Sequence, residues 1–156
     1  MKILKMAIVA TILNLVRVTA DTDSASVKAL QDIQNSHIEG NIPNQDVFEK
    51  YMERDLVAYF SKKNKEEIKV EYEYLRNGPT QSGVSYPKYY LWVVVKVKKD
   101  ERTIDAGAVR VQAIDKKIFE VTNYLSKKEI QDNGNILDSV FPKGLNEAIL
   151  IRSKEK

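Results

Sequence analysis

The residue types that most enzymes use for nucleophilic or metal chemistry are scarce in this chain. The sequence contains no cysteine and a single histidine, His37. Thiol catalysis, thiolate metal ligation and two-histidine metal centres are therefore excluded, and a Ser-His-Asp triad would depend on His37 alone. Glycine-rich phosphate loops and the nucleophile elbow have no counterpart in the sequence. We expect no catalytic residue, no metal site and no cofactor, and we expect His37 to be a surface residue.

Acid–base chemistry by a carboxylate and a tyrosine is the one enzymatic option that this composition leaves open. A carboxylate enclosed in an apolar pocket can act as a base because burial raises its pKa. The candidates are Asp55, which borders the apolar face of a predicted helix, and Asp105 or Glu120 on predicted strands. Arg54 adjoins Asp55, so a surface ion pair competes with the catalytic interpretation. The tyrosines that could act with these carboxylates are Tyr51, Tyr59, Tyr72 and Tyr90.

Aromatic residues gather on two predicted strands and on the loop that joins them. Aromatic side chains favour strands, so a role in the core and on the sheet face is one interpretation. Tyr and Trp also supply large amphipathic contact areas in protein interfaces. The second interpretation is therefore a ligand- or partner-binding surface with the loop at 77–87 as its rim. The residues of this predicted surface are Tyr72, Tyr74, Tyr86, Tyr90 and Trp92.

The strands that must position these residues follow one another in the second half of the chain. Residues 89–98 are rich in valine and aromatic residues and are apolar on both faces around Trp92, which predicts a central strand. Residues 67–76 alternate strictly between apolar and charged, which predicts an antiparallel strand with one wet face. Residues 103–114 and 118–125 predict two further strands, and Gly107 inside the first of them indicates a bulge or bend.

Helices precede and follow these strands. The spacing of Val27, Leu30 and Ile33 predicts a short helix with one apolar stripe, which a loop at 39–44 ends. Asn44 is a favourable N-cap for the strongest predicted helix, of about sixteen to eighteen residues, with its apolar row at Phe48, Met52, Leu56 and Phe60. Ser126 and Glu129 form a capping box that opens the short C-terminal helices, and the chain is expected to fray from residue 153.

The element order predicts an α+β domain, with a long helix packed across a curved four-stranded antiparallel sheet and short C-terminal helices. Over residues 44–125 this order resembles the cystatin-like and NTF2-like group of folds. The resemblance is one of element order and not of sequence motif. Cystatin-type inhibitors carry a Gln-x-Val-x-Gly hairpin, whereas the corresponding hairpin here reads Lys99-Asp100-Glu101-Arg102. The NTF2-like resemblance implies a cone between helix and sheet that could hold a small apolar ligand.

The first twenty residues have the layout of a secretory signal peptide. A short basic start precedes an apolar run at 6–16, and small residues at 18–20 predict cleavage after Ala20. The run is shorter than the roughly twenty residues of a bilayer span, so an uncleaved anchor is the weaker alternative. We predict a signal peptide at 1–20, a helix and loop at 21–43 and a single α+β domain at 44–152, with no membrane segment after cleavage.

Charge and composition then limit the partners of the exported chain. The chain has 25 basic and 22 acidic residues, and removal of Lys2, Lys5 and Arg17 with the signal peptide leaves equal numbers. A basic excess is the footprint of nucleic-acid binding, so we expect no nucleic-acid partner. The absence of cysteine and of glycosylation sequons favours a bacterial periplasm or culture medium.

The sequence therefore predicts an exported, non-catalytic protein that binds a protein partner in the cell envelope or outside the cell. The alternative is an NTF2-like pocket for a small apolar ligand, with weak acid–base chemistry from Asp55 or Glu120. A third class is a subunit held by strand addition at the edge of the sheet.

Overall fold

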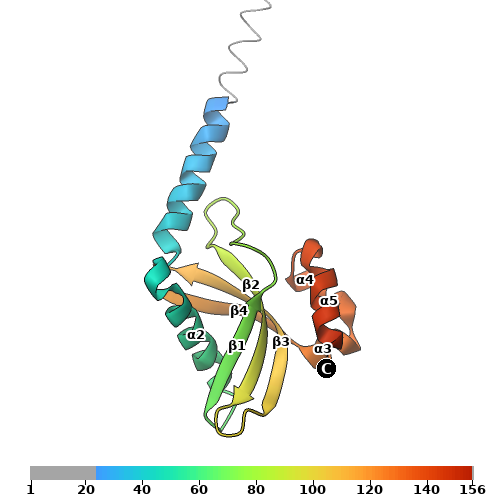
Figure 1. Ribbon diagram of the computed structural model, residues 1–156. Helices are drawn as coiled ribbons and strands as arrows, with labels where there is room; N and C mark the ends of the chain where they lie inside the picture. Colours follow the sequence, from blue (N-terminus) through green and yellow to red (C-terminus); the bar gives the residue numbers. More distant parts are fainter. Residues whose placement is uncertain (1–23, 156) are drawn as a thin grey trace, which may run out of the picture.

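The computed structural model describes residues 24–155 of the chain (Figure 1). The predicted signal peptide and its cleavage position lie outside these residues. A helix covers residues 24–41 and is followed by α2 (Gln45–Ser61). The strands are β1 (Ile68–Tyr74), β2 (Lys88–Val97), β3 (Thr103–Ile114) and β4 (Ile118–Ser126). The C-terminal helices are α3 (Lys127–Asp132), α4 (Leu137–Val140) and α5 (Asn146–Lys154), with 3-10 turns at Gly134–Ile136 and Lys143–Leu145.

The four strands form one antiparallel sheet in the order β1-β2-β3-β4. Each strand pairs with its neighbour in sequence, so Val93 of β2 lies between Tyr72 of β1 and Gly107 of β3. α2 lies against one face of the sheet and the C-terminal helices lie against the other (Figure 1). The predicted α+β class, the long helix and the four-stranded antiparallel sheet are confirmed.

The core between α2 and the sheet is filled by side chains. Met52, Leu56 and Phe60 of α2 are buried against alternate residues of the central strand, such as Leu91 and Val93. Phe60 also meets the ring of Tyr124 edge to face. The predicted i, i+4 row of the long helix therefore packs against the sheet. Phe48, the first residue of this row, is only partly buried.

The second core lies on the opposite face of the sheet. Tyr90 and Trp92 of β2 pack there with Leu137, Phe141 and Ile149 of the C-terminal segment. β2 is thus covered on both faces around Trp92, as the apolar residues on both of its faces predict. The burial of both faces also explains why β2 carries few charged residues before Lys96.

The N-terminal helix is longer than predicted and includes Gly40. Its last residue, Asn41, donates a hydrogen bond from Nδ2 to the carbonyl oxygen of His37 at 2.8 Å. Asn41 Oδ1 accepts from the backbone N–H of Asp115, and its carbonyl accepts from the N–H of Lys116. This buried asparagine holds the helix against the β3–β4 turn. These tertiary contacts explain why the helix continues through Gly40, where the sequence predicts a loop.

Three smaller predictions also need correction. A bulge or bend is expected at Gly107, but the pairing register shifts elsewhere: between Val95 and Lys96 in the β2–β3 pair and between Arg110 and Val111 in the β3–β4 pair. Asn44 precedes α2 in extended conformation but makes no side-chain cap hydrogen bond. The chain does not fray at 153, because Ser153 is buried and α5 continues to Lys154. The predicted capping box of α3 is confirmed, since Ser126 accepts from the N–H of Glu129 and the Glu129 carboxylate accepts from the N–H of Ser126.

Candidate functional site

The structure divides four of the five aromatic residues of the predicted binding surface between the two faces of the sheet, and the fifth, Tyr86, lies in the loop. Tyr90 and Trp92 are 4% and 7% exposed and lie under the C-terminal helices. The Tyr90 hydroxyl is 2.9 Å from the Thr80 hydroxyl, so its polar end is also engaged. These two residues belong to the core, and they could reach a partner only if the C-terminal helices moved away.

Tyr72 and Tyr74 lie on the other face, at the edge strand β1, beside α2. Both hydroxyl groups donate to the carboxylate of Glu49 in the first turns of α2, Tyr74 at 3.2 Å. Their rings meet edge to face, with 5.8 Å between centroids and an interplanar angle of 89°. Tyr89 continues the row, since its ring centroid is 6.3 Å from that of Tyr74. A tyrosine face with one carboxylate therefore replaces the predicted five-residue surface.

The environment of this face changes the acidity of its tyrosines. Burial raises the pKa of Tyr72 and Tyr74 well above the usual tyrosine value, and the Glu49 carboxylate raises both further. Burial alone raises the pKa of Tyr89 to about 12. These hydroxyls are protonated at neutral pH, so they act as hydrogen-bond donors and not as bases.

The two predicted pocket carboxylates share a surface hollow of about 430 Å³ beside α2 and β4. Tyr59 also lines it, but Trp92 lies on the opposite face of the sheet. Asp55 Oδ2 accepts from the backbone N–H of Phe119 at 2.7 Å, and its Oδ1 accepts from Arg54 Nε at 2.8 Å. The predicted pairing with Arg54 is confirmed, and Asp55 ties α2 to β4.

The other candidate carboxylates are engaged in local contacts. Glu120 is exposed and accepts from Gln112 Nε2 at 2.6 Å across the β3–β4 pair. Asp105 accepts from the neighbouring N–H of Ala106. The space between α2 and the sheet is occupied by the side chains of the first core. These contacts place no free carboxylate in an enclosed apolar pocket, which is what a general base of this kind needs.

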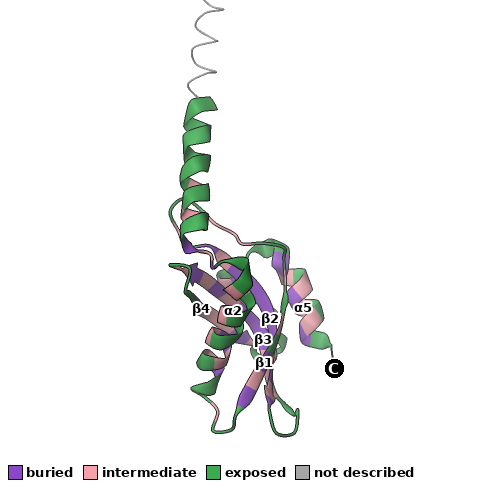
Figure 2. Cartoon of the chain, turned by 60° about the vertical axis from the view of Figure 1, so that its left-hand side comes forward, coloured by how far each residue is buried: buried purple, intermediate pink, exposed green. Residues whose placement is uncertain are grey.

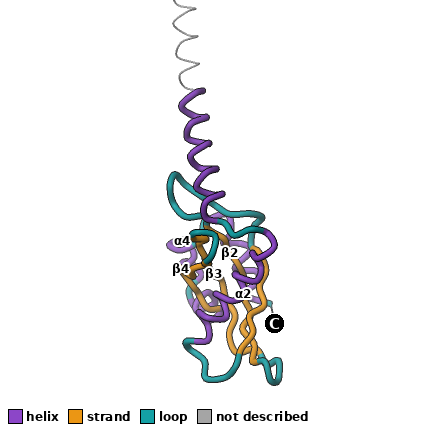
Figure 3. Tube along the Cα trace, turned by 90° about the vertical axis from the view of Figure 1, so that its left-hand side faces the viewer, coloured by secondary structure: helices purple, strands orange, loops and turns teal. Residues whose placement is uncertain are grey.

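An open apolar surface lies between the N-terminal helix and the loop from 75 to 87. Val27, Leu30 and Ile33 are 58%, 64% and 51% exposed, and Val84 opposite them is 75% exposed. Two adjoining hollows, of about 490 and 510 Å³, share Ile33 and Val84 in their walls. We call these two hollows together the helix–loop groove. The helix runs on beyond the sheet, and the loop lies beside its last turns (Figures 2 and 3).

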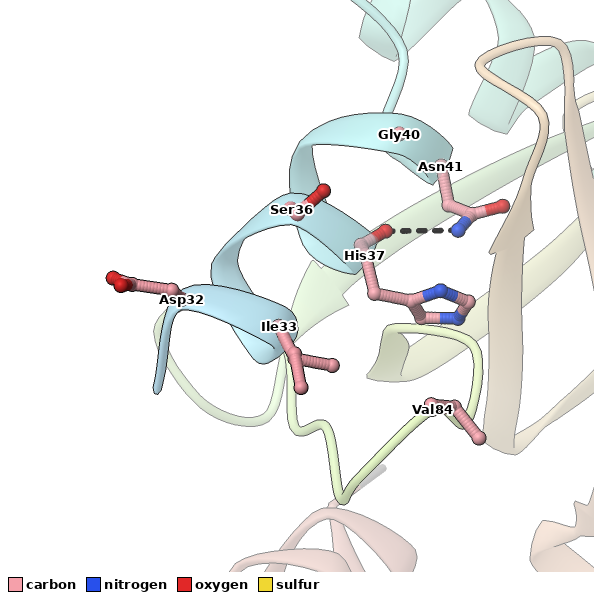
Figure 4. Close-up of a pocket in the computed structure, with 7 residues that line it drawn as sticks. All are labelled: Asp32, Ile33, Ser36, His37, Gly40, Asn41 and Val84. Atoms are coloured by element: carbon pink, nitrogen blue, oxygen red, sulfur yellow. Dashed lines mark hydrogen bonds between the residues drawn. The ribbon is translucent and has the colours of Figure 1, made fainter. Parts of the chain in front are cut away.

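His37 stands at the inner end of the helix–loop groove. Figure 4 shows Ile33, His37 and Val84 around one space, while the carboxylate of Asp32 points away from it. The His37 ring stacks on Tyr86 with 5.8 Å between centroids, and His37 Nε2 is buried without a hydrogen-bond partner. His37 is therefore partly exposed, but its ring is packed on one side and one ring nitrogen is buried. The loop that reaches it is held by Gln81 Nε2, which donates to the carbonyl oxygens of Gly83 and Ser85.

Sequence reasoning found the apolar stripe of this groove but assigned it no role. The stripe is exposed because the helix extends beyond the sheet. The local sequence pattern does not predict this extension. Tyr86 is the one residue of the predicted aromatic surface that borders the groove. Across residues 24–155 the structure has no group of His, Asp and Glu side chains arranged to hold a metal ion. Within the same residues no helix is both long and apolar enough to cross a bilayer.

Comparisons of the chain with protein-family models, with curated proteins and with solved structures found no match. The site therefore has to be interpreted from its own geometry.

Proposed function

We propose that this protein is an exported, non-catalytic binding protein that holds a protein partner in the helix–loop groove. The exposed apolar stripe of the N-terminal helix, with Val84 opposite, is the observation that carries the proposal. Contiguous apolar surface that stays exposed in an otherwise packed domain marks interaction sites. The partner would be met in the periplasm, in the cell envelope or outside the cell, as the signal-like first twenty residues suggest.

The distribution of charge around the N-terminal helix supports this proposal. At 100° per residue, Lys28, Asp32 and Glu39 fall on one side of the helix. Val27, Leu30 and His37 fall on the opposite side, together with the uncharged Gln34. The outer part of the groove is therefore lined by apolar and amide side chains, whereas Ser36 and His37 border its inner part and the Asp32 carboxylate points away from it. Such a surface suits an apolar segment of a protein, with Gln31 and Gln34 available for hydrogen bonds at the rim.

The anchoring of the helix makes the groove a defined site. Asn41 fixes the helix end to the β3–β4 turn, and Gln81 shapes the facing loop. A preformed groove loses less conformational entropy on binding than a flexible one. Asp55, Asp105 and Glu120, the candidate carboxylates, are each engaged in hydrogen bonds to neighbouring groups, which agrees with the non-catalytic interpretation.

Site-specific photocrosslinking in the producing cell tests the proposal. A benzoylphenylalanine at position 30 or 84 faces the groove, whereas one at position 28 lies on the charged side of the same helix. We expect the same protein adduct from positions 30 and 84 and none from 28. Equal adducts from all three positions, or none from any, would contradict a partner in this groove. Mass measurement of the exported protein tests the predicted cleavage after Ala20 in the same sample.

An NTF2-like or cystatin-like site is the second candidate. The hollow beside Asp55, Tyr59 and Glu120 is the observation that favours it, together with the packing of one long helix on a four-stranded antiparallel sheet. In this alternative the hollow binds a small apolar ligand and Asp55 or Glu120 supplies the acid–base group. A ligand bound there would be lost in Tyr59→Ala and kept in Leu30→Asp.

A further inference from the structure

The tyrosine face at the edge of the sheet has a charge arrangement that its structural role does not require. Glu49 is exposed, and its two oxygens accept from Tyr72 and Tyr74. Among residues 24–155 the ion pairs of the structure include Asp55, Glu71 and Glu73 but not Glu49. Within residues 24–155, the hydrogen bonds to this carboxylate therefore come from two neutral hydroxyl groups and not from a cation.

The two tyrosines whose hydroxyl groups contact this carboxylate belong to a row of aromatic rings at steep angles to one another. Tyr72 and Tyr74 are perpendicular, and Tyr89 is inclined at 61° to Tyr74. Phe48, the neighbour of Glu49 on α2, meets Tyr89 edge to face at 5.3 Å. Ring faces attract cations through their quadrupole, and donation of the phenolic hydrogen to a carboxylate increases the electron density of the ring.

We propose that Glu49, Tyr72 and Tyr74 form a binding site for a methylated ammonium group, separate from the helix–loop groove. A carboxylate without a cationic partner supplies the counter-charge, and the perpendicular rings supply π surfaces. A methylated ammonium is weakly hydrated, so it loses less solvation free energy on such a surface than a lysine ammonium does. The same chemistry is offered by a small quaternary amine and by a trimethylated lysine side chain.

The competing explanation is that the two hydroxyls only hold α2 against β1. That role would need the hydrogen bonds but no affinity for cations. The proposal does not depend on the function proposed for the groove, since the two sites share no residue.

Titration of the purified protein with tetramethylammonium, observed by NMR, tests the site. We expect the ring resonances of Tyr72 and Tyr74 to shift in a saturable manner, and tert-butanol, a neutral probe of similar size, to leave them unchanged. Trp92, buried on the opposite face, reports whether the fold is intact. Equal shifts with tert-butanol, or no saturable shift, would overturn the proposal.

Two variants then assign the affinity to these residues. Glu49→Gln keeps the size of the side chain and should weaken tetramethylammonium binding about 5-fold, and Tyr74→Leu should weaken it similarly. Glu53→Gln, one turn further along α2, is the matched control and should bind as the unmodified protein does. Unchanged binding in Glu49→Gln would overturn the site. Choline and trimethyllysine amide, compared by affinity, distinguish a free ligand from a modified side chain.

Discussion

Asn41 and Asp55 show how much of this structure depends on single polar residues whose long-range contacts the sequence does not reveal. Each joins segments far apart in the chain: Asn41 reaches the β3–β4 turn, and Asp55 reaches Phe119. The pairing of Asp55 with Arg54 could be predicted from adjacency. The hydrogen bond to the Phe119 N–H could not, because it depends on how α2 crosses the sheet. Local patterns report no contact over such a separation.

Replacement of Asp55 by alanine should lower the free energy of unfolding by about 1–3 kcal/mol, because the Phe119 N–H and the Arg54 guanidinium lose their acceptor. Chemical denaturation measures this change. Glu53→Ala on the same helix is the control and should change the free energy by less than about 0.5 kcal/mol. An Asp55→Ala protein of full stability would contradict a structural role and would favour the acid–base alternative.

At the scale of elements, the strands were the most predictable part of the molecule. Strict alternation defines β1 because one of its faces packs against a core, and the predicted bounds of β3 are confirmed although β3 contributes residues to both cores. The end of the N-terminal helix was less predictable, because Gly40 and Pro43 indicate a break that the Asn41 contacts delay. A glycine inside a strand indicates a local constraint on the backbone, and Gly107 has one. The constraint is the close approach of β4 and not a shift in the pairing register. A Cβ at this position would lie 2.2 Å from the carbonyl oxygen of Leu125, so β4 can approach only a glycine.

Gly107→Ala should therefore destabilise the protein by about 1–3 kcal/mol or more, since the β3–β4 pairing would have to separate locally. Thermal unfolding followed by circular dichroism checks the change. Gly144→Ala provides the control, because a Cβ there meets no atom within 4 Å. If the two variants melt at the same temperature, the close approach at Gly107 does not constrain the sheet.

At the scale of the whole molecule, the fold class could be predicted but the division between core and surface could not. The apolar character of β2 on both faces indicates that two layers cover the sheet. It does not say that short C-terminal helices form the second layer and bury Tyr90 and Trp92. For the same reason the sequence could not separate these residues from Tyr72 and Tyr74. The stripe of Val27, Leu30 and Ile33 could be predicted as an apolar helix face, but its exposure could not.

The tyrosine pKa values predict how the whole fold responds to alkali. Burial raises the pKa of Tyr89 to about 12 and that of Tyr124 further. A tyrosine whose folded pKa exceeds its unfolded value of about 10 binds its proton more tightly in the folded state. Stability is therefore fully present below pH 10 and should fall as the pH rises from 10 to 12.

Absorbance at 295 nm during an alkaline titration measures this coupling. We expect the ionisation of the buried tyrosines to coincide with the loss of near-UV circular dichroism. Tyr89→Phe should reduce the pH dependence of stability between pH 10 and 12. Ionisation of every tyrosine near pH 10 in a folded protein would contradict the burial.

The most direct test of the proposed function is the affinity of the partner captured by crosslinking for two variants of the N-terminal helix. Leu30→Asp places a charge in the exposed stripe, and Lys28→Asp changes a charge on the opposite side. We expect Leu30→Asp to weaken binding at least about 10-fold, as the loss of a central apolar contact does, and Lys28→Asp to leave it within about 2-fold. Full affinity in Leu30→Asp, or a larger loss in Lys28→Asp, would show that the partner does not bind in the helix–loop groove.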